Sequence, residues 1–509
     1  MSWRGWSVFG LLLLLVAALM LLPAAAAALD GDAAVLRAFA AGAALTGCVA
    51  GLILIATHRL SARTETVGEF GALFAALIVA PAAAALPLKL AAPQFAAEAL
   101  YFEMVSTFTT TGATIFDRPE EIPRAIHFWR GLTAWLGGLL ALVMAFALLA
   151  PRNLGGYEVQ GERERRGAIG RLKGEPEWAG GRGREAAADR VATAIGAVLP
   201  IYFGLTAALA VLLVSAGQGP RAALISAMGV VSTSGVSAEP GAGFGGAGLQ
   251  AEIAAAAFLI LASTRLAFGE KGTGPLRLRE MPSDPEMRVL AIAVAGATLW
   301  LFVRHWIGAL DLVASDDESS FKALWGAFFT ALSFATTTGV VSESWDAARA
   351  WSGLDNPSLI LFGLAMMGGG IATTAGGVKL LRAYALFKHG SRELERLVRP
   401  SSISGTGGRR RGLRREGAQI AWIFVMLFLL ALAFATLAFS LSGLDFDLSL
   451  VVAVATLSNT GPLLPTAVAE GSWITTVTAE GRAIACLVMI LGRVELLALI
   501  AMLNSDNWR

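Results

Sequence analysis

Long apolar segments, separated by shorter polar or basic ones, follow one another along the whole chain of 509 residues. About ten of them approach the twenty or so residues that a helix needs to cross a bilayer. They begin near Val8, Val35, Val67, Ala125, Val191, Leu249, Met287, Leu359, Gln419 and Ile474. None shows the sustained alternation of apolar and polar residues that a membrane-spanning strand requires. Because backbone groups find no water inside a bilayer, the pattern predicts an all-α integral membrane protein.

The first apolar segment allows two interpretations. A cleavable signal peptide would explain the small residues that follow Pro23. The segment from Val8 to Leu29 is also long enough to span a bilayer, and further apolar segments follow it. We therefore expect a retained transmembrane helix.

Basic residues gather in every second connection between the apolar segments. They lie at Arg59 and Arg63, between Arg152 and Arg190, between Arg265 and Arg288, and between Lys379 and Arg415. The positive-inside rule predicts that these connections and both termini of this multi-pass protein are cytoplasmic. Such short patches mark a cytoplasmic side rather than a nucleic-acid site.

Four Thr/Ser-Gly segments recur between the apolar segments, with their glycines roughly 100 to 125 residues apart. We call residues 109–114, 232–237, 336–341 and 458–463 the Thr-Gly loops. A semi-apolar stretch of about half the spanning length precedes each of them: Ala96–Phe108, Arg221–Val231, Phe321–Ala335 and Leu448–Leu457. Such stretches suit re-entrant pore helices, and irregular backbone at this depth survives only in protein or beside a water-filled cavity.

The predicted fold is thus four repeats of helix, pore helix, loop and helix around one pore, after two extra N-terminal helices. The units are an N-terminal helix pair (1–64), pore repeat 1 (65–152), a cytoplasmic loop (153–190), pore repeat 2 (191–270), pore repeat 3 (271–398), a basic cytoplasmic linker (399–416) and pore repeat 4 (417–509).

The Thr-Gly loops are suited to binding a dehydrated monovalent cation, because rings of backbone carbonyls can replace its hydration shell. The candidate selectivity-filter residues are Thr110, Thr111, Gly112, Thr233, Ser234, Gly235, Thr337, Thr338, Gly339, Asn459, Thr460 and Gly461. No acidic side chain lies within the loops, which disfavours a calcium-type carboxylate ring. Ordinary external turns are the alternative, but four loops in equivalent places make it the weaker one.

A glycine-rich stretch, residues 368–379, interrupts the eighth apolar segment. Each of its glycines would weaken a helix by about 1 kcal/mol relative to alanine, so local unwinding below the filter is expected. Close helix packing through small residues is the alternative. Arg493 lies in the last apolar segment, where a charge normally faces a cavity or a partner. An ion pair with Glu495, or snorkelling to the interface, would also explain it.

These features together resemble the Trk/Ktr/HKT superfamily of potassium transporters, most closely its bacterial TrkH branch. The resemblance rests on residues 108–114, on residues 369–379 with 388–400, and on residues 491–495, and it spans nearly the whole chain. It implies a homodimeric K⁺ uptake protein of the bacterial plasma (inner) membrane with one pore per subunit. The resemblance further implies filter glycines at Gly112, Gly235, Gly339 and Gly461, and a cytoplasmic TrkA-like ring of nucleotide-binding regulatory subunits. It also implies a gate, to which we assign Gly368, Gly369, Gly370, Thr373, Thr374, Gly376, Gly377, Lys379 and Arg493.

Three functions are compatible with these sequence features. The first is a gated, K⁺-selective pore driven by the membrane potential, with K⁺ bound by the filter residues. The second is a symporter coupled to Na⁺ or H⁺, for which Glu103, Glu252 and Glu495 are the few intramembrane candidates. The third, an intramembrane enzyme, is disfavoured because no hydrolase or metalloprotease motif is present. No nucleotide motif is present either, so we expect no organic cofactor on this chain.

Composition narrows the class further. Hydrophobic residues make up 56% of the chain and charged residues 15%, which is too apolar for an ordinary soluble protein. The only two cysteines, Cys48 and Cys486, both fall inside apolar segments, so neither a disulfide framework nor a zinc site is expected.

Overall fold

The computed structural model describes residues 7–57, 66–116, 118–150, 156–159, 183–238, 244–268, 278–308, 317–354, 357–398, 415–467 and 477–494. Within these residues the chain forms only helices and connecting loops. Several sequence predictions fall outside them: most of the loop 153–190, most of the linker 399–416, Glu495 and both termini.

Seven stretches of the described residues are long and apolar enough to cross a membrane. They are Val8–Leu29, Ala33–Thr57, Phe74–Ala91, Arg124–Leu149, Arg190–Ser215, Pro285–Arg304 and Gly417–Leu441. The helices that carry them are α1 (Val8–Leu19) with α2 (Leu21–Leu29), α3 (Ala33–Thr57), α4 (Thr66–Ala91), α6 (Arg124–Met144) with the π-helix η2 (Ala145–Leu149), α8 (Gly183–Ser215), α12 (Pro285–Gly308) and α17 (Arg415–Leu441).

Two of the ten predicted crossings, those that begin near Leu249 and Leu359, are shorter than expected. Helix α10 (Gly248–Ala262) stops at Ser263 and is followed by the four-residue α11 (Arg265–Phe268). Helix α15 (Ser358–Met367) stops where the glycine-rich stretch begins, and α16 (Leu380–Val398) starts only after it. The crossing predicted from Ile474 is described over α21 (Ala479–Val494), and the chain after Val494 lies outside the described residues. The glycines that follow Met367 explain the interruption after α15, because Gly368 and Gly376 allow close approaches between backbone segments.

The four predicted pore helices are present. They are α5 (Ala97–Phe108), α9 (Pro220–Val231), α13 (Asp317–Ala335) and α18 (Phe446–Leu457). All four end at the residue that the sequence predicted; α13 begins earlier, so it is longer than half a span. Each runs directly into its Thr-Gly loop.

The packing of the helices forms a closed sequence of contacts around the four short ones. Each short helix packs against the long helix before it: α5 on α4, α9 on α8, α13 on α12 and α18 on α17. A second helix of each unit packs on the short helix of the next: α6 on α9, α10 on α13, α15 on α18 and α21 on α5. The last contact joins the end of the chain to its first Thr-Gly unit and closes the circle.

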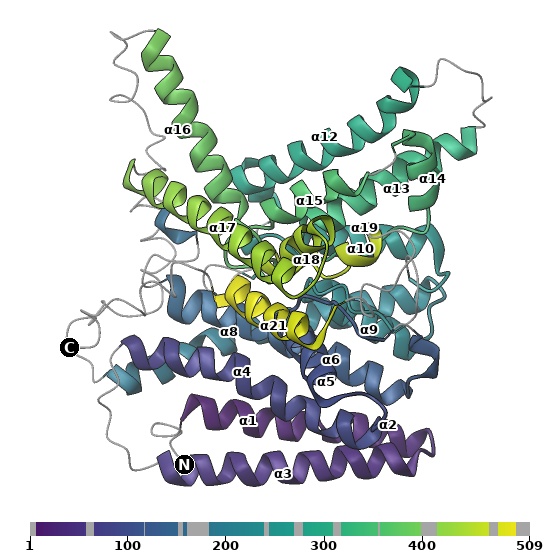
Figure 1. Cartoon of the computed structure of the whole chain (residues 1–509), viewed down its shortest axis with the longest axis vertical. Helices are drawn as coiled ribbons and strands as arrows, with labels where there is room; N and C mark the ends of the chain where they lie inside the picture. The colour runs from purple at the N-terminus through teal and green to yellow at the C-terminus, as the bar shows by residue number, and fades with distance from the viewer. Residues whose placement is uncertain are drawn as a thin grey trace.

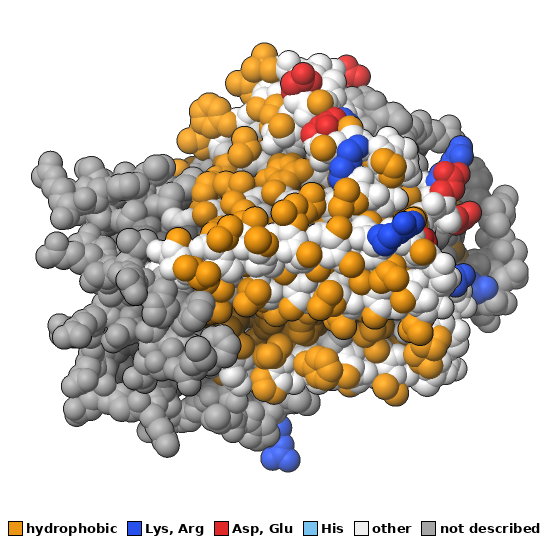
Figure 2. Space-filling model, turned by 90° about the horizontal axis from the view of Figure 1, so that it is seen from below, with side chains coloured by type: hydrophobic (Ala, Val, Ile, Leu, Met, Phe, Trp, Pro, Cys, Tyr) orange, Lys and Arg blue, Asp and Glu red, His pale blue; other side chains and the backbone are white. Residues whose placement is uncertain are grey.

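The short helices lie in the middle of the molecule, with α1 and α3 at one end and α12 and α16 at the other (Figure 1). The face below α1 and α3 is covered by apolar side chains (Figure 2). Leu14, Leu52 and Ile55 are among the exposed residues of these two helices. Such an extended apolar face fits contact with lipid. Short connections complete the fold: η1 (Pro119–Glu121), η4 (Tyr157–Val159), η5 (Leu278–Ser283), α14 (Trp345–Ser352) and α19 (Leu463–Ala467).

Candidate ion pathway and its block

The same backbone conformation occurs once in each Thr-Gly loop. Thr110, Thr233 and Thr337 have φ angles of 53°, 53° and 59°, and Asn459 has 53°. This left-handed region is unfavourable for a β-branched residue such as threonine. Strain of this kind persists only where the surrounding structure enforces it, and it clusters at functional sites. Its fourfold repetition marks the loops as a built feature.

The reason for this conformation is the way the short helices end. In each loop the N–H of the residue after the left-handed one donates to a carbonyl five residues earlier, as in a Schellman helix end. The four bonds are Thr111 to Ser106 (2.8 Å), Ser234 to Gly229 (2.9 Å), Thr338 to Ser333 (2.9 Å) and Thr460 to Ala455 (2.8 Å). Glycine or asparagine usually occupies such a position, and only the fourth loop has one of them there.

A pair of hydroxyl groups also recurs in every loop. They are Thr109 with Thr111 (2.8 Å), Ser232 with Ser234 (2.9 Å), Thr336 with Thr338 (3.1 Å) and Ser458 with Thr460 (3.2 Å). The first member of each pair was not among the predicted site residues. A hydroxyl residue two places before the Ser or Thr that precedes the glycine of each loop was the signal for it.

Close contacts at the glycines join the loops into a ring. A Cβ atom on Gly112 would collide with the carbonyl oxygen of Ser234, and one on Gly235 with that of Thr338. A Cβ on Gly339 would approach Pro462 to 2.9 Å. A Cβ on Gly461 would collide with the backbone of Ala113. The contacts therefore run from the first loop through the second, third and fourth and back to the first.

The fourth loop departs from the pattern of the other three. Of the four predicted filter glycines, Gly461 alone lies outside the left-handed region, whereas Gly112, Gly235 and Gly339 have φ of 77°, 64° and 77°. Its N–H donates across the ring to the Thr111 carbonyl at 2.6 Å. The Asn459 amide donates to the Thr111 hydroxyl and to the Met489 carbonyl, both at 3.0 Å. The fourth loop is therefore tied to the first through hydrogen bonds.

Residues 368–379 form a closed loop between α15 and α16, which we call the interhelical loop. Its two ends are joined by Val378 N–H to the Met366 carbonyl (2.9 Å), Lys379 N–H to Met367 (3.1 Å) and Leu380 N–H to Gly369 (3.0 Å). Inside it, Thr373 Oγ1 donates to the Gly370 carbonyl at 2.6 Å and Lys379 Nζ to the Ala375 carbonyl at 2.5 Å. The predicted break in the helix is present, and the alternative of a continuous, closely packed helix is wrong.

The interhelical loop lies directly against the ring. The Thr233 hydroxyl donates to the Thr374 hydroxyl at 2.9 Å, and the Gly376 N–H donates to the Thr337 hydroxyl at 2.9 Å. A Cβ on Gly376 would collide with the Ser458 carbonyl oxygen, so only glycine allows this approach. Two of the three left-handed threonines are thus held by the interhelical loop.

Arg493 holds the third. It is 8% exposed, and it donates to the Thr109 carbonyl through Nε at 2.9 Å, to the Thr374 carbonyl at 2.6 Å and to the Thr110 hydroxyl. Gly492 allows α21 to come this close, because a Cβ there would collide with the Leu457 carbonyl. Snorkelling is therefore the wrong explanation for Arg493. The proposed partner Glu495 lies outside the described residues.

The chain is similar to known proteins in sequence and in fold. A family model described as "TrkH: Cation transport protein" matches residues 36–173 and 322–507. The chain belongs to this TrkH family. A family of transporters excludes an enzyme as the function of the chain.

Individual relatives agree with the family. The Trk system potassium uptake protein TrkI of Halomonas elongata is 26% identical over 84% of this chain and 81% of its own length. The Trk system potassium uptake protein TrkH of Escherichia coli K12 is 28% identical over 80% of this chain and 79% of its own. The crystal structure of the potassium transporter TrkH from Vibrio parahaemolyticus matches with a TM-score of 0.81 and 24% identity, and the match covers 100% of both chains. The last match shows that the fold is the same.

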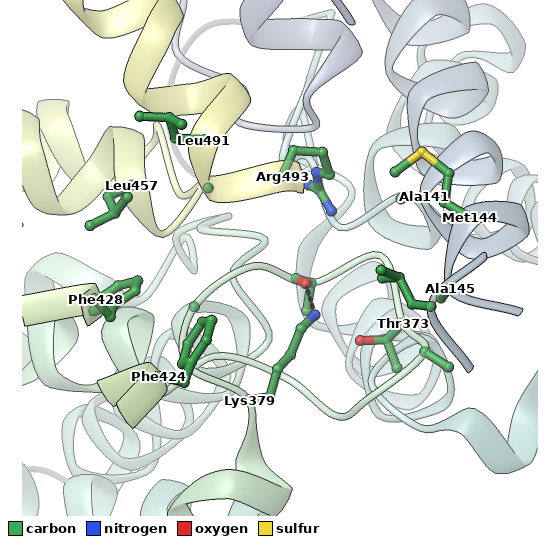
Figure 3. Close-up of a pocket in the computed structure, with 15 residues that line it drawn as sticks. Ala141, Met144, Ala145, Thr373, Lys379, Phe424, Phe428, Leu457, Leu491 and Arg493 are labelled. Carbon is green, nitrogen blue, oxygen red and sulfur yellow. Dashed lines mark hydrogen bonds between the residues drawn. The ribbon is translucent and has the colours of Figure 1, made fainter. Parts of the chain in front are cut away.

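Beside the interhelical loop, the TrkH-family chain has a cavity of about 40 Å³. It is lined by α6, η2, the interhelical loop, α17, α18 and α21, and Lys379 and Arg493 point toward it (Figure 3). Such a volume holds roughly one to three water molecules. Arg493 and the interhelical loop therefore contact both the ring and this cavity.

Two buried carboxylates support the ring from outside. Glu103 pairs with Arg130 Nε at 2.5 Å and accepts the Ile115 N–H at 2.8 Å. Glu252 accepts from Trp325 Nε1 (2.6 Å), from the Ser342 hydroxyl (2.8 Å) and from the Glu343 N–H (2.7 Å). Each carboxylate thus fixes the chain just after one Thr-Gly loop. Both were candidates for coupling to Na⁺ or H⁺, and both have all their oxygens engaged in structural bonds.

Proposed function

We propose that this chain carries K⁺ into the cell through one pore whose selectivity filter is the ring of Thr-Gly loops. The observation that supports this most is the closed ring itself, with one left-handed residue per loop and with the carbonyl oxygens of Ser234 and Thr338 at two of its four glycine contacts. Oxygen atoms of this kind can replace the water around a monovalent cation. The names of the relatives, Trk system potassium uptake proteins, supply the choice of K⁺.

We assign the interhelical loop and Arg493 to the gate of this pore. They occupy the oxygens of the three left-handed threonines and leave a fixed positive charge at the mouth of the ring. A cation at that point would meet repulsion rather than coordination. Opening therefore requires the interhelical loop to leave the ring.

The driving force that we propose is the membrane potential, worth about 2.3 kcal/mol per charge for each 100 mV. The alternative is symport with Na⁺ or H⁺. We place it second because Glu103 and Glu252 are engaged in structural bonds.

The remaining expectations concern the assembly. We propose a homodimer with one pore per subunit, both termini in the cytoplasm, and a cytoplasmic TrkA-like ring of nucleotide-binding subunits. In this proposal K⁺ is both cargo and bound ion, no organic cofactor resides on the chain, and nucleic acid plays no part.

The test is uptake of ⁸⁶Rb⁺ and ²²Na⁺ into proteoliposomes that hold the purified chain, with and without an imposed Na⁺ or pH gradient. We expect Rb⁺ uptake that follows the voltage, exceeds Na⁺ uptake and ignores both gradients. Uptake that needs a Na⁺ or pH gradient would favour the symporter, and equal Rb⁺ and Na⁺ uptake would refute the filter.

A further inference from the structure

A buried acidic and basic cluster lies where α10, α11 and α12 meet, and the ring and the gate do not account for it. Asp284 is 6% exposed and lies 3.8 Å from Arg265, measured from Oδ1 to Nη2. Glu286, in the first turn of α12, is fully buried. A buried carboxylate without full hydrogen bonding is costly, so its position needs a reason.

The carboxylate of Glu286 contacts the backbone of the interhelical loop. Its Oε1 accepts the Ile371 N–H at 3.0 Å. The N–H of the preceding Gly370 donates to the Ser263 carbonyl at 3.2 Å, and a Cβ on Gly370 would lie only 3.1 Å from Glu286 Oε2. Two successive N–H groups of the interhelical loop are thus held by the helix junction.

The same loop holds the ring with its other half. Thr374 bonds to Thr233, and Gly376 bonds to Thr337. Both follow, by a few residues, the Gly370 and Ile371 that the junction holds. The interhelical loop is therefore a bridge, with the helix junction at one side and the ring at the other.

The backbone of the bridge is strained next to the bond from Glu286. Ala372, the residue after Ile371, has a φ of 51°, and Lys379 at the end of the interhelical loop has 82°. Neither residue adopts this region without enforcement by its surroundings. Loss of the bond at Ile371 would allow the neighbouring Ala372 to relax, and the interhelical loop would leave its blocking position more often.

We propose that Glu286 is the positioning residue that latches the interhelical loop against the ring, so that movement of the α11–α12 junction releases the block. The inference rests on the proposed function of the ring and the interhelical loop as filter and gate. The junction lies outside the ion pathway, and the segment leading into it belongs to a connection that we predict to be cytoplasmic. The start of α12 is therefore where a cytoplasmic event would act on the gate.

The test is ⁸⁶Rb⁺ and ²²Na⁺ flux through the purified chain in proteoliposomes without any partner protein. Glu286→Ala removes the acceptor for the Ile371 N–H, and we expect about a tenfold rise in basal Rb⁺ flux from the loss of one charge-assisted bond. The Rb⁺/Na⁺ ratio should stay that of the wild type, since the ring is untouched. Glu286→Gln keeps an acceptor oxygen and should restore most of the block. A well-folded Glu286→Ala protein with wild-type or lower flux would overturn the proposal.

A second perturbation acts from the side of the interhelical loop and covers the case in which Glu286→Ala does not fold. Gly370→Ala places a methyl group 2.6 Å from the Ser263 carbonyl and 3.1 Å from Glu286 Oε2, which wedges the loop off the junction. We expect raised basal flux, whereas Gly363→Ala on α15, with nothing within 4 Å, should leave the flux unchanged. Equal flux in the two glycine variants would overturn the latch.

A double variant separates a latch from general loosening. If both changes break the same contact, Glu286→Ala with Gly370→Ala should raise flux no more than the larger single effect. Multiplied effects would contradict the shared contact. Failure of the proposed function itself would look different: deletion of residues 369–377 would then give no selective Rb⁺ flux at all.

Discussion

The left-handed threonines are the residues on which the candidate filter depends most. Thr110, Thr233 and Thr337 adopt a conformation that costs on the order of 1–3 kcal/mol each. This conformation lets the chain turn sharply at the end of each short helix. The residue after each turn then lies against the next loop, where the ring is formed.

Glycine is required two residues after each left-handed threonine for a steric reason. In Gly112→Ala the new Cβ would collide with the Ser234 carbonyl oxygen and push the first and second loops apart. We expect at least a tenfold loss of Rb⁺/Na⁺ discrimination in proteoliposome flux. Gly51→Ala on α3, where nothing lies within 4 Å, is the matched control and should transport normally. Wild-type discrimination in Gly112→Ala would mean that the first loop does not select ions.

Arg493 provides the second prediction at this scale. Arg493→Ala removes the hydrogen bonds to Thr109 and Thr374, each worth about 1.5–3 kcal/mol as charge-assisted bonds. Since about 1.4 kcal/mol corresponds to tenfold, basal Rb⁺ flux should rise by at least tenfold. Arg482→Ala, on the same helix α21 but bonded to Val477 and Glu98 away from the ring, should not raise it. Equal flux in the two arginine variants would count against a block by Arg493.

At the scale of elements, the ion pair between α5 and α6 fixes the first loop. Arg130→Ala would leave the fully buried Glu103 charge without its partner, which typically destabilises a protein by about 3–5 kcal/mol. The exposed pair of Arg118 and Glu121 is the control, where Arg118→Ala should cost about 0–1 kcal/mol. Thermal unfolding of the two variants in detergent measures the difference. Equal melting temperatures would show that the pair does not support α5.

The sequence predicted the elements well and their contacts poorly. The ends of all four short helices and the interruption after Met367 followed from apolar length and from glycine content. The contacts of Glu103 and Glu252 could not be predicted in this way. Each depends on a chain segment that folds back from beyond a Thr-Gly loop, and no local pattern encodes the distance to it. The same holds for Glu286, whose partner Ile371 is far along the chain.

In the fourth loop, Gly461 makes a contact that the sequence could not predict. Its sequence was expected to act as one quarter of a ring, and it does contact the first and third loops. Its bond from Gly461 to Thr111, however, depends on the backbone of another loop and had no signal in the sequence. The roles of all these residues in ion selection stay predictions.

At the scale of the whole molecule, an ion pair joins the N-terminal helices to α9 of pore repeat 2: Asp30 lies 2.5 Å from Arg221. The Arg221 guanidinium holds the pKa of the Asp30 carboxyl below its ordinary value of 3.8. A lowered pKa stabilises the folded state above pH 3.8, and this contribution disappears as the pH falls through the folded value. The melting temperatures of wild type and Asp30→Asn should differ at pH 7 and converge once the pH falls below the lowered folded pKa. A difference that persists at low pH would contradict the assignment.

The central claim is that four unequal loops of one chain form a K⁺ filter that the interhelical loop blocks. The most direct test is the reversal potential in a planar bilayer, with K⁺ on one side and Na⁺ on the other, for the variant lacking residues 369–377. We predict a reversal displaced toward K⁺ by about 59 mV for each tenfold preference. Adding Gly112→Ala to the same variant should bring the reversal close to zero. A reversal near zero before that change, or one that Gly112→Ala leaves in place, would contradict the account.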